Sequence, residues 1–288
     1  GSKSISAEEA YSMLQAIETE LNVKIKNTPA YNENKAKNAY LNKNTKKTKT
    51  AWEKAKKRLV EIHTERIIFG ISMVTGIRPY ALRQLEWHNI DFKSGNLFIN
   101  ESKYQPQQEI KNIIPPHIME QLVEYHGHLK EYIKEFDMRG DTGIKMQTDG
   151  SFEGVPHLLL VGLSGRTGKL LRREEEGDKE GKVSRSHKTV KEDVMEKTHS
   201  SLSESHLRGI FRTRLKAAYM AVYKKDEAAA EKYAKSKLTN VFRHLFVIKS
   251  LDEGILTDTE IAFILGHGGK ILVATYRDQI HAKARMVK

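Results

Sequence analysis

The sequence predicts a mainly α-helical fold with a small antiparallel β-sheet, which places it in the α+β class. Long stretches carry apolar residues at helical spacing, most clearly between Trp52 and Val74. Two short apolar runs, Leu97-Phe98-Ile99 and Ile110 to Ile114, are separated by a polar stretch and bounded by turn residues, which is typical of a hairpin. A chain of 288 residues can bury a sizeable core around such elements.

The first predicted helix begins at Ser6. Ser6-Ala7-Glu8-Glu9 has the spacing of a capping box, with Ser6 as the N-cap residue and Glu9 reaching back to it. Apolar residues then recur at helical spacing: Ala10, Met13, Leu14, Ile17 and Leu21. Residues 26–49 are polar and rich in asparagine and lysine, and we interpret them as a solvated loop or a pair of weak helical turns.

Glycine and proline divide the next part of the chain. The long helix from Trp52 to Val74 is broken by Gly76, and Pro79 suits the first turn of a short helix. The hairpin follows, and a further helix is expected from about His117 to Phe136. Residues 137–155 are expected to be irregular.

The following stretch is poor in core-forming residues. Leu158 to Val161 is a short apolar run, which we interpret as a buried strand or a helix edge. Arg172 to Lys197 is almost wholly charged, so it cannot build a core and is expected to be a mobile insertion.

Helical periodicity returns in the C-terminal third. One helix is expected from Ser203 to Lys224, and another contains Phe242 and ends at Gly254. Thr257 is expected to cap a last helix, which ends at Leu265.

Composition indicates a polyanionic partner. Lys and Arg number 49 against 37 Asp and Glu, a formal net charge of +12, and this favours nucleic acid. Cysteine is absent, which excludes disulfide frameworks and thiolate metal sites. No apolar run approaches the roughly 18 residues of a membrane span, and no signal peptide opens the chain, so no membrane partner is expected.

Four separated segments suggest a specific chemistry. They are Thr75-Gly76-Ile77-Arg78-Pro79, Asn240-Val241-Phe242-Arg243-His244, Leu265-Gly266-His267, and Tyr276, which stands nine residues after His267. An arginine after a glycine turn, an Arg-His pair, a Leu-Gly-His and a spaced tyrosine, in this order, resemble the tyrosine recombinases. Members of that family cut and rejoin DNA through a phosphotyrosine link.

In-line attack of a tyrosine on a phosphodiester needs three kinds of help. The nonbridging oxygens gain charge and need fixed donors, which arginines such as Arg78 and Arg243 supply through two parallel hydrogen bonds. The nucleophile, Tyr276 by this resemblance, has an ordinary pKa near 10 and must lose its proton. The departing 5′-oxygen must gain one.

The resemblance assigns roles to the remaining positions. It implies that His267 is catalytic and that Lys103, in the turn of the hairpin, is the general acid, with Lys111 in the next strand as a rival. Asn240 stands where the family has a histidine or lysine. Its amide can donate a hydrogen bond to phosphate but cannot take a proton. We assign His244 to packing or helix support.

The resemblance also implies an organisation. Residues 4–288 would form the catalytic domain, a helical bundle with the sheet at one edge and insertions near 26–49 and 137–199. Gly1-Ser2 is typical of a tag remnant, so residues 1–3 are set apart, and the family's N-terminal DNA-clamping domain is expected to be missing. The expected partner is double-stranded DNA, bound by a homotetramer on two sites with C-terminal segments exchanged. The expected setting is the bacterial or phage cytoplasm, at the nucleoid.

Several alternatives stay open. A telomere resolvase uses the same chemistry to form hairpin ends, a type IB topoisomerase shares it with other spacing, and a DNA-binding protein of recombinase ancestry could lack activity. Integrase, transposase and resolvase roles of a mobile genetic element are not separated. Gly165-Arg166-Thr167-Gly168-Lys169 fails as a phosphate loop, because Leu163 and Leu170 occupy its required positions. No His-Glu-x-x-His is present, and we predict neither metal nor cofactor.

Overall fold

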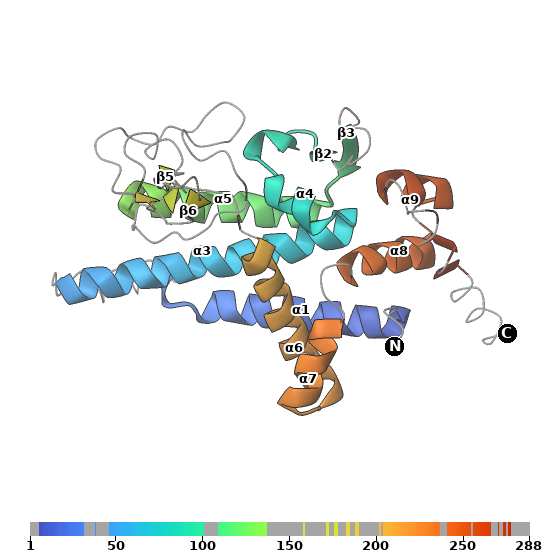
Figure 1. Cartoon of the computed structure of the whole chain (residues 1–288), viewed down its shortest axis with the longest axis horizontal. Helices are drawn as coiled ribbons and strands as arrows, with labels where there is room; N and C mark the ends of the chain where they lie inside the picture. Colours follow the sequence, from blue (N-terminus) through green and yellow to red (C-terminus); the bar gives the residue numbers. More distant parts are fainter. Residues whose placement is uncertain are drawn as a thin grey trace.

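Helix α3 (Lys46–Thr75) runs through the middle of the molecule, with α1 (Ala7–Asn27) along one side and α5 (Pro116–Phe136) along the other (Figure 1). In this computed structural model the elements are mainly helical, with a three-stranded antiparallel sheet. The predicted α+β class is therefore confirmed. The structure describes residues 6–31, 38, 46–100, 109–136, 158, 171–172, 176–177, 183–184, 188–189, 202, 204–236, 241–254, 256–265, 270, 273–274 and 276–277.

Helix α1 begins and ends as the sequence predicts. The Ser6 hydroxyl accepts a hydrogen bond from the Glu9 amide at 3.1 Å, so Ser6 is the N-cap residue. The helix continues to Asn27, and a 3₁₀ turn, η1 (Pro29–Tyr31), follows. The predicted loop 26–49 is therefore shorter than expected, because the last turn of α1 and the first turn of α3 occupy its two ends.

Helices α3 and α5 are antiparallel and joined by polar contacts along their length. The Trp52 indole donates to Glu135 at 2.7 Å, and the Lys56 ammonium donates to Glu131 at 3.0 Å. As residue numbers rise along α3, those of the partners fall along α5. Lys56 is only 2% exposed, so Glu131 neutralises a charge that the core could not otherwise hold.

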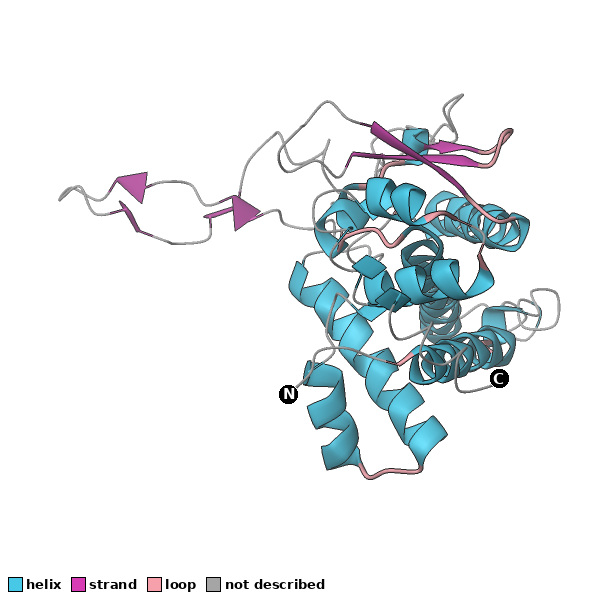
Figure 2. Ribbon diagram, turned by 90° about the vertical axis from the view of Figure 1, so that its right-hand side faces the viewer, coloured by secondary structure: helices cyan, strands magenta, loops and turns pink. Residues whose placement is uncertain are grey.

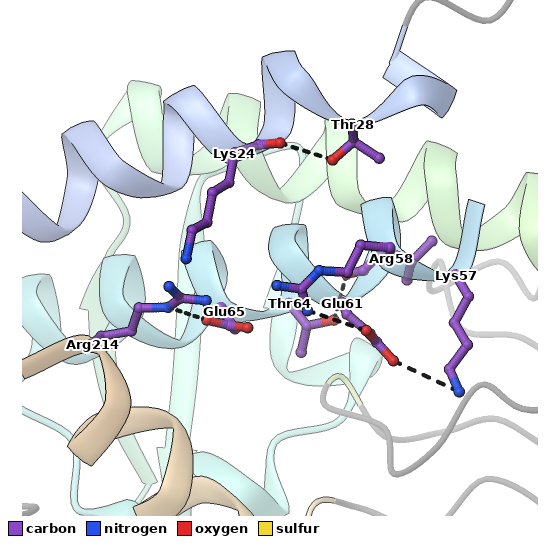
Figure 3. Close-up of polar contacts among 9 residues, drawn as sticks. Lys24, Thr28, Lys57, Arg58, Glu61, Thr64, Glu65 and Arg214 are labelled. Carbon is purple, nitrogen blue, oxygen red and sulfur yellow. Dashed lines mark hydrogen bonds and ion pairs between the residues drawn. The ribbon is translucent and has the colours of Figure 1, made fainter. Parts of the chain in front are cut away.

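Two further helices pack against each other, and the first of them also packs against α1. They are α6 (Glu204–Tyr223) and α7 (Glu227–Ser236). Arg214 of α6, 4% exposed, donates to Glu65 of α3 at 2.5 Å and to Glu20 of α1 at 2.8 Å. Figure 3 shows Arg214 pointing from its helix toward Glu65. One buried guanidinium thus links three helices.

The small sheet lies at one edge, as Figure 2 shows. Its order is β1 (Ile90–Asp91), β2 (Asn96–Asn100), β3 (Glu109–Ile113). Both pairs are antiparallel, and Phe98 stands opposite Lys111. Helix α4 (Pro79–Gln84) and the 3₁₀ turn η2 (Trp87–Asn89) lead into the sheet. The predicted hairpin is confirmed.

Of the predicted apolar run from Leu158 to Val161, only Leu158 is among the described residues. The side chain of Leu158 is fully buried. Its amide donates to the Leu85 carbonyl at 2.9 Å, and its carbonyl accepts from the Tyr125 hydroxyl at 2.8 Å.

Most of the predicted mobile insertion lies outside the described residues. Four two-residue strands are described within or beside it. β4 (Leu171–Arg172) pairs with β7 (Lys188–Thr189), and β5 (Glu176–Gly177) pairs with β6 (Val183–Ser184), both antiparallel.

The C-terminal helices are α8 (Val241–Glu253) and α9 (Asp258–Leu265). Gly254 ends α8 with a φ of +63°, a left-handed conformation that glycine adopts without strain. Thr257 and Glu260 bond each other's backbone amides at 2.7 and 3.3 Å, which is the capping box expected of Thr257.

An aromatic cluster connects α8 to the rest of the core. Phe242 of α8 lies 5.0 Å from Phe69 of α3 and 4.9 Å from Phe211 of α6, between ring centroids. These contacts fix the face of α8 that points inward.

Among the helices that the structure describes, none is long and apolar enough to cross a membrane.

Candidate functional site

The turn at Gly76 is the first component of the candidate site. Gly76 has a φ of +60°, and a Cβ placed there would lie 2.8 Å from both Leu265 Cδ2 of α9 and Phe246 Cδ1 of α8. The Thr75 hydroxyl accepts from the Ile77 amide at 3.1 Å and stabilises the turn. Glycine is therefore required both by the backbone conformation and by the close packing of two later helices.

Arg78 is the N-cap residue of α4. Its backbone is extended, with φ −72° and ψ 146°, and Pro79 opens the helix as predicted. The Arg78 side chain is partly buried. Its position two residues after Gly76 places it at the junction of α3, α8 and α9.

Arg243 connects this turn to the end of α9. It is 6% exposed, and its guanidinium donates to the Gly76 carbonyl at 2.9 Å and also to the Leu265 carbonyl. Two of the five N–H groups of the arginine are thereby assigned to backbone oxygens. Arg243 thus holds together the segment that carries Arg78 and the segment that leads into His267.

Tyr276 lies against the same helix. It is 1% exposed, and its hydroxyl is 2.6 Å from Nδ1 of His244. The two rings meet edge to face, with centroids 5.5 Å apart and planes at 81°. Val273, one turn earlier, is also buried and anchors the segment.

Adjacent residues of α8 thus face two components of the site. Successive helical residues point about 100° apart, so Arg243 reaches the Gly76 turn while His244 reaches Tyr276. The expectation that His244 serves packing or helix support did not include this contact. The Arg-His pair was the only sequence signal for this contact, since sequence spacing does not show which way the histidine ring points.

The structure brings some of the predicted site residues together and does not describe others. The Arg78 turn, Arg243 and Tyr276 converge. Lys103, Asn240 and His267 lie outside the described residues. The backbone of Lys111 pairs with Phe98 in the sheet, and its side chain also lies outside the description.

An apolar groove of about 640 Å³ lies beside the site, between β3, α8 and α9. Ile113, Phe246 and Phe263 are among its lining residues. It includes none of the three predicted catalytic residues that the structure describes, so it is a neighbour of the candidate site and not part of it.

One further group of polar side chains lies elsewhere, between α3 and α5. Among the described residues, His63, Glu124 and His128 form a cluster in which one potential metal-ligand atom from each lies within 4.8 Å of the others. This cluster was not predicted from the sequence, because its members come from two helices that are far apart along the chain.

Comparison with known proteins adds no assignment. No family model matches the chain, and no curated protein matches it in sequence.

Proposed function

We propose that this chain cuts and rejoins DNA as the catalytic domain of a tyrosine recombinase. The observation that supports this most directly is the convergence of three segments far apart in the sequence. Arg243 bonds the Gly76 carbonyl, two residues before Arg78, and its neighbour His244 contacts the hydroxyl of Tyr276. A basic chain with a net charge of +12 suits a DNA substrate.

The proposed reaction is a transesterification. The Tyr276 oxygen attacks the scissile phosphorus, the bond from phosphorus to the 5′-oxygen breaks, and a 3′-phosphotyrosine forms. The tyrosine proton passes to a base and the 5′-oxygen takes a proton from an acid, so charge and atoms balance. Attack of a 5′-hydroxyl on the phosphotyrosine reverses these steps and rejoins the strand.

Arg78 and Arg243 would stabilise the charge on the nonbridging oxygens. The two carbonyl contacts of Arg243 hold its guanidinium plane in a fixed orientation inside the protein. A preorganised charge in a water-poor site stabilises a transition state more than a mobile charge in water does.

Tyr276 must leave its present position to react. A side chain that is 1% exposed cannot reach a DNA phosphate from outside the protein. We assign the observed contact with His244 to a resting arrangement, from which the segment around Tyr276 moves when DNA binds. Conformational steps of this kind commonly separate binding from chemistry.

His244 would take the tyrosine proton in this resting arrangement, before the segment around Tyr276 moves. Its Nδ1 is at hydrogen-bond distance from the tyrosine hydroxyl, and with the ring proton on Nε2 it can accept the tyrosine proton. Asn240, at the position where the resemblance would place a histidine or lysine, cannot accept a proton at neutral pH. His244 therefore supplies a function that Asn240 lacks.

Lys103 remains the proposed general acid. The strand register ends at the pair Asn100–Glu109, so Lys103 belongs to the connecting segment, whereas Lys111 lies within the paired strand opposite Phe98. The resemblance places the general acid in this connection, where a lysine would reach the leaving oxygen. His267 keeps its proposed place beside the phosphate.

The direct test is covalent capture of DNA. Wild-type protein is incubated with duplex containing a nick beside the cleavage site, and adducts are separated on a denaturing gel. Tyr276→Phe retains the ring and removes the attacking oxygen, so DNA binding should persist while the adduct disappears. Tyr219→Phe is the matched control and should form adduct normally. Adduct formed by Tyr276→Phe would disprove the assignment of the nucleophile.

The remaining alternatives differ in product. A recombinase acting as a tetramer on two sites yields exchanged duplexes, a telomere resolvase yields hairpin ends, and a DNA-binding protein without activity yields no adduct. The same substrates therefore separate the three classes. A recombinase product would fit the expected setting at bacterial or phage DNA in the cytoplasm.

A further inference from the structure

Three residues form a polar cluster between α3 and α5. His63 comes from α3, while Glu124 and His128 stand one turn apart on α5 and so share a face. The cluster continues the row of contacts that Trp52–Glu135 and Lys56–Glu131 begin. At this third position no direct hydrogen bond joins His63 to its partner on α5.

His63 is buried with one ring nitrogen unpaired. The residue is 0% exposed, and its Nε2 has no hydrogen-bond partner among the described residues. The nearest carboxylate oxygen, Glu124 Oε1, is 3.9 Å away, which is beyond hydrogen-bond distance. Buried polar atoms nearly always have a partner, so this atom calls for an explanation.

The surroundings of Nε2 suit a metal ion. The rings of His63 and His128 lie 4.7 Å apart between centroids, and Glu124 adds a carboxylate. Two imidazoles and one carboxylate match the ligands of zinc and do not match the all-oxygen ligands of calcium or magnesium.

We propose that His63, Glu124 and His128 bind a divalent transition metal, with zinc the best match to this donor set, and that the ion joins α3 to α5. Zinc–nitrogen bonds of about 2.0–2.1 Å place tetrahedral ligands about 3.4 Å apart. Because the potential ligand atoms already lie within 4.8 Å of one another, side-chain shifts on the order of an ångström close the site. A water molecule completes the coordination.

Arg66 contacts two of the three proposed ligands. Its Nη2 is 2.5 Å from Glu124 Oε2 and 2.9 Å from Nδ1 of His63. When Nε2 binds metal, Nδ1 carries the ring proton, so Arg66 must release His63. The positive charge of Arg66 also opposes the ion, and its removal should not weaken binding.

The site lies apart from the proposed DNA chemistry. His63 is twelve residues before Thr75, the last residue of α3, a distance of about 18 Å along the helix at 1.5 Å per residue. The proposal therefore stands whether or not the chain acts on DNA, and it departs from the expectation of no metal.

The test is zinc binding by the full chain after treatment with a chelator. Calorimetric titration should show one equivalent of Zn²⁺ bound with a raised Tm, and Mg²⁺ should do neither. Glu124→Gln and His128→Gln alter partly exposed residues, so folding should survive. Each should lose more than about 100-fold in zinc affinity, since even outer partners of a metal contribute 10–100-fold. Arg66→Gln should bind zinc at least as tightly as wild type.

The matched control is His88→Gln. His88 is exposed and lies 3.1 Å from Glu86, so it is a second histidine beside a carboxylate, and its loss should leave the tight equivalent unchanged. Co²⁺ bound to wild type should show the visible bands of tetrahedral nitrogen and oxygen coordination. Zinc affinity that is unchanged in Glu124→Gln and His128→Gln would overturn the proposal, as would the absence of tight binding by wild type. Either result would show that the unpaired Nε2 of His63 is not a metal ligand.

Discussion

Two neighbouring residues of α8 show how one helix can serve two tasks. Arg243 is buried and bonds backbone carbonyls, whereas His244 is partly exposed and contacts a tyrosine hydroxyl. If His244 only packed against Tyr276, any side chain of similar shape would suffice there. A proton acceptor is a stricter requirement, and a substitution can separate the two.

His244→Asn is the informative change. An asparagine places a hydrogen-bonding atom close to the position of Nδ1, so the contact with Tyr276 can persist, but the amide cannot take a proton. We expect DNA binding to remain and the cleavage rate to fall by about 10²–10⁴-fold. Single-turnover cleavage rates and DNA-binding affinities measure the two effects separately, and a variant with an unchanged cleavage rate would return His244 to a packing role.

At the scale of elements, the turn between α3 and α4 is where the helices of the site meet. Its glycine allows a left-handed backbone and lets α8 and α9 approach within contact of the chain. The same residue offers its carbonyl to Arg243. The position of the arginine therefore depends on the conformation of the turn.

Gly76→Ala should be strongly destabilising. The left-handed backbone alone costs about 1–2 kcal/mol with a Cβ, and displacement of Leu265 and Phe246 adds about 1–3 kcal/mol. Gly254→Ala is the matched control, because Gly254 has a φ of +63° but no atom within 4 Å of the added carbon. Urea denaturation of both variants measures the difference. Equal losses would show that the turn is not closely packed.

At the scale of the whole molecule, Arg214 joins a helix from the C-terminal third of the chain to two helices near its N-terminus. Burial lowers the pKa of its guanidinium, but hydrogen bonds and charges from Glu65 and Glu20 raise the pKa by more, and it remains charged. Three helices are thus held in register by one cation. Removal of that cation leaves two carboxylates near each other in a poorly hydrated interface.

Arg214→Met should lower the free energy of unfolding by about 3 kcal/mol. This lies at the low end of the range of about 3–5 kcal/mol for breaking a buried pair, because Glu20 keeps contact with solvent. Arg208→Met on the same helix removes an exposed pair with Glu204 and should cost less than about 1 kcal/mol. Thermal and urea unfolding provide the comparison, and similar values for the two variants would contradict a structural role for the triad.

The sequence by itself determined most of the elements of this protein, although α7, β1 and the four two-residue strands were not predicted. Local signals depend on nearby residues, so Ser6, Gly76, Gly254 and Thr257 mark helix ends correctly, and the hairpin follows from two apolar runs. The α+β class follows from the same patterns. The order of Arg78, Arg243 and Tyr276 also identified the residues of a candidate site, although their roles remain a proposal.

Only the tertiary structure decided which residues meet. The contact of His244 with Tyr276, the bond of Arg243 to Gly76 and the cluster at His63 join residues from different elements. Such contacts depend on how helices pack and rotate about their axes, and a single sequence does not specify these directly. A rotation of one helix by about 100° about its axis replaces the side chain at a contact with that of the adjacent residue. For this reason local patterns found the elements, while packing decided the partners of each side chain.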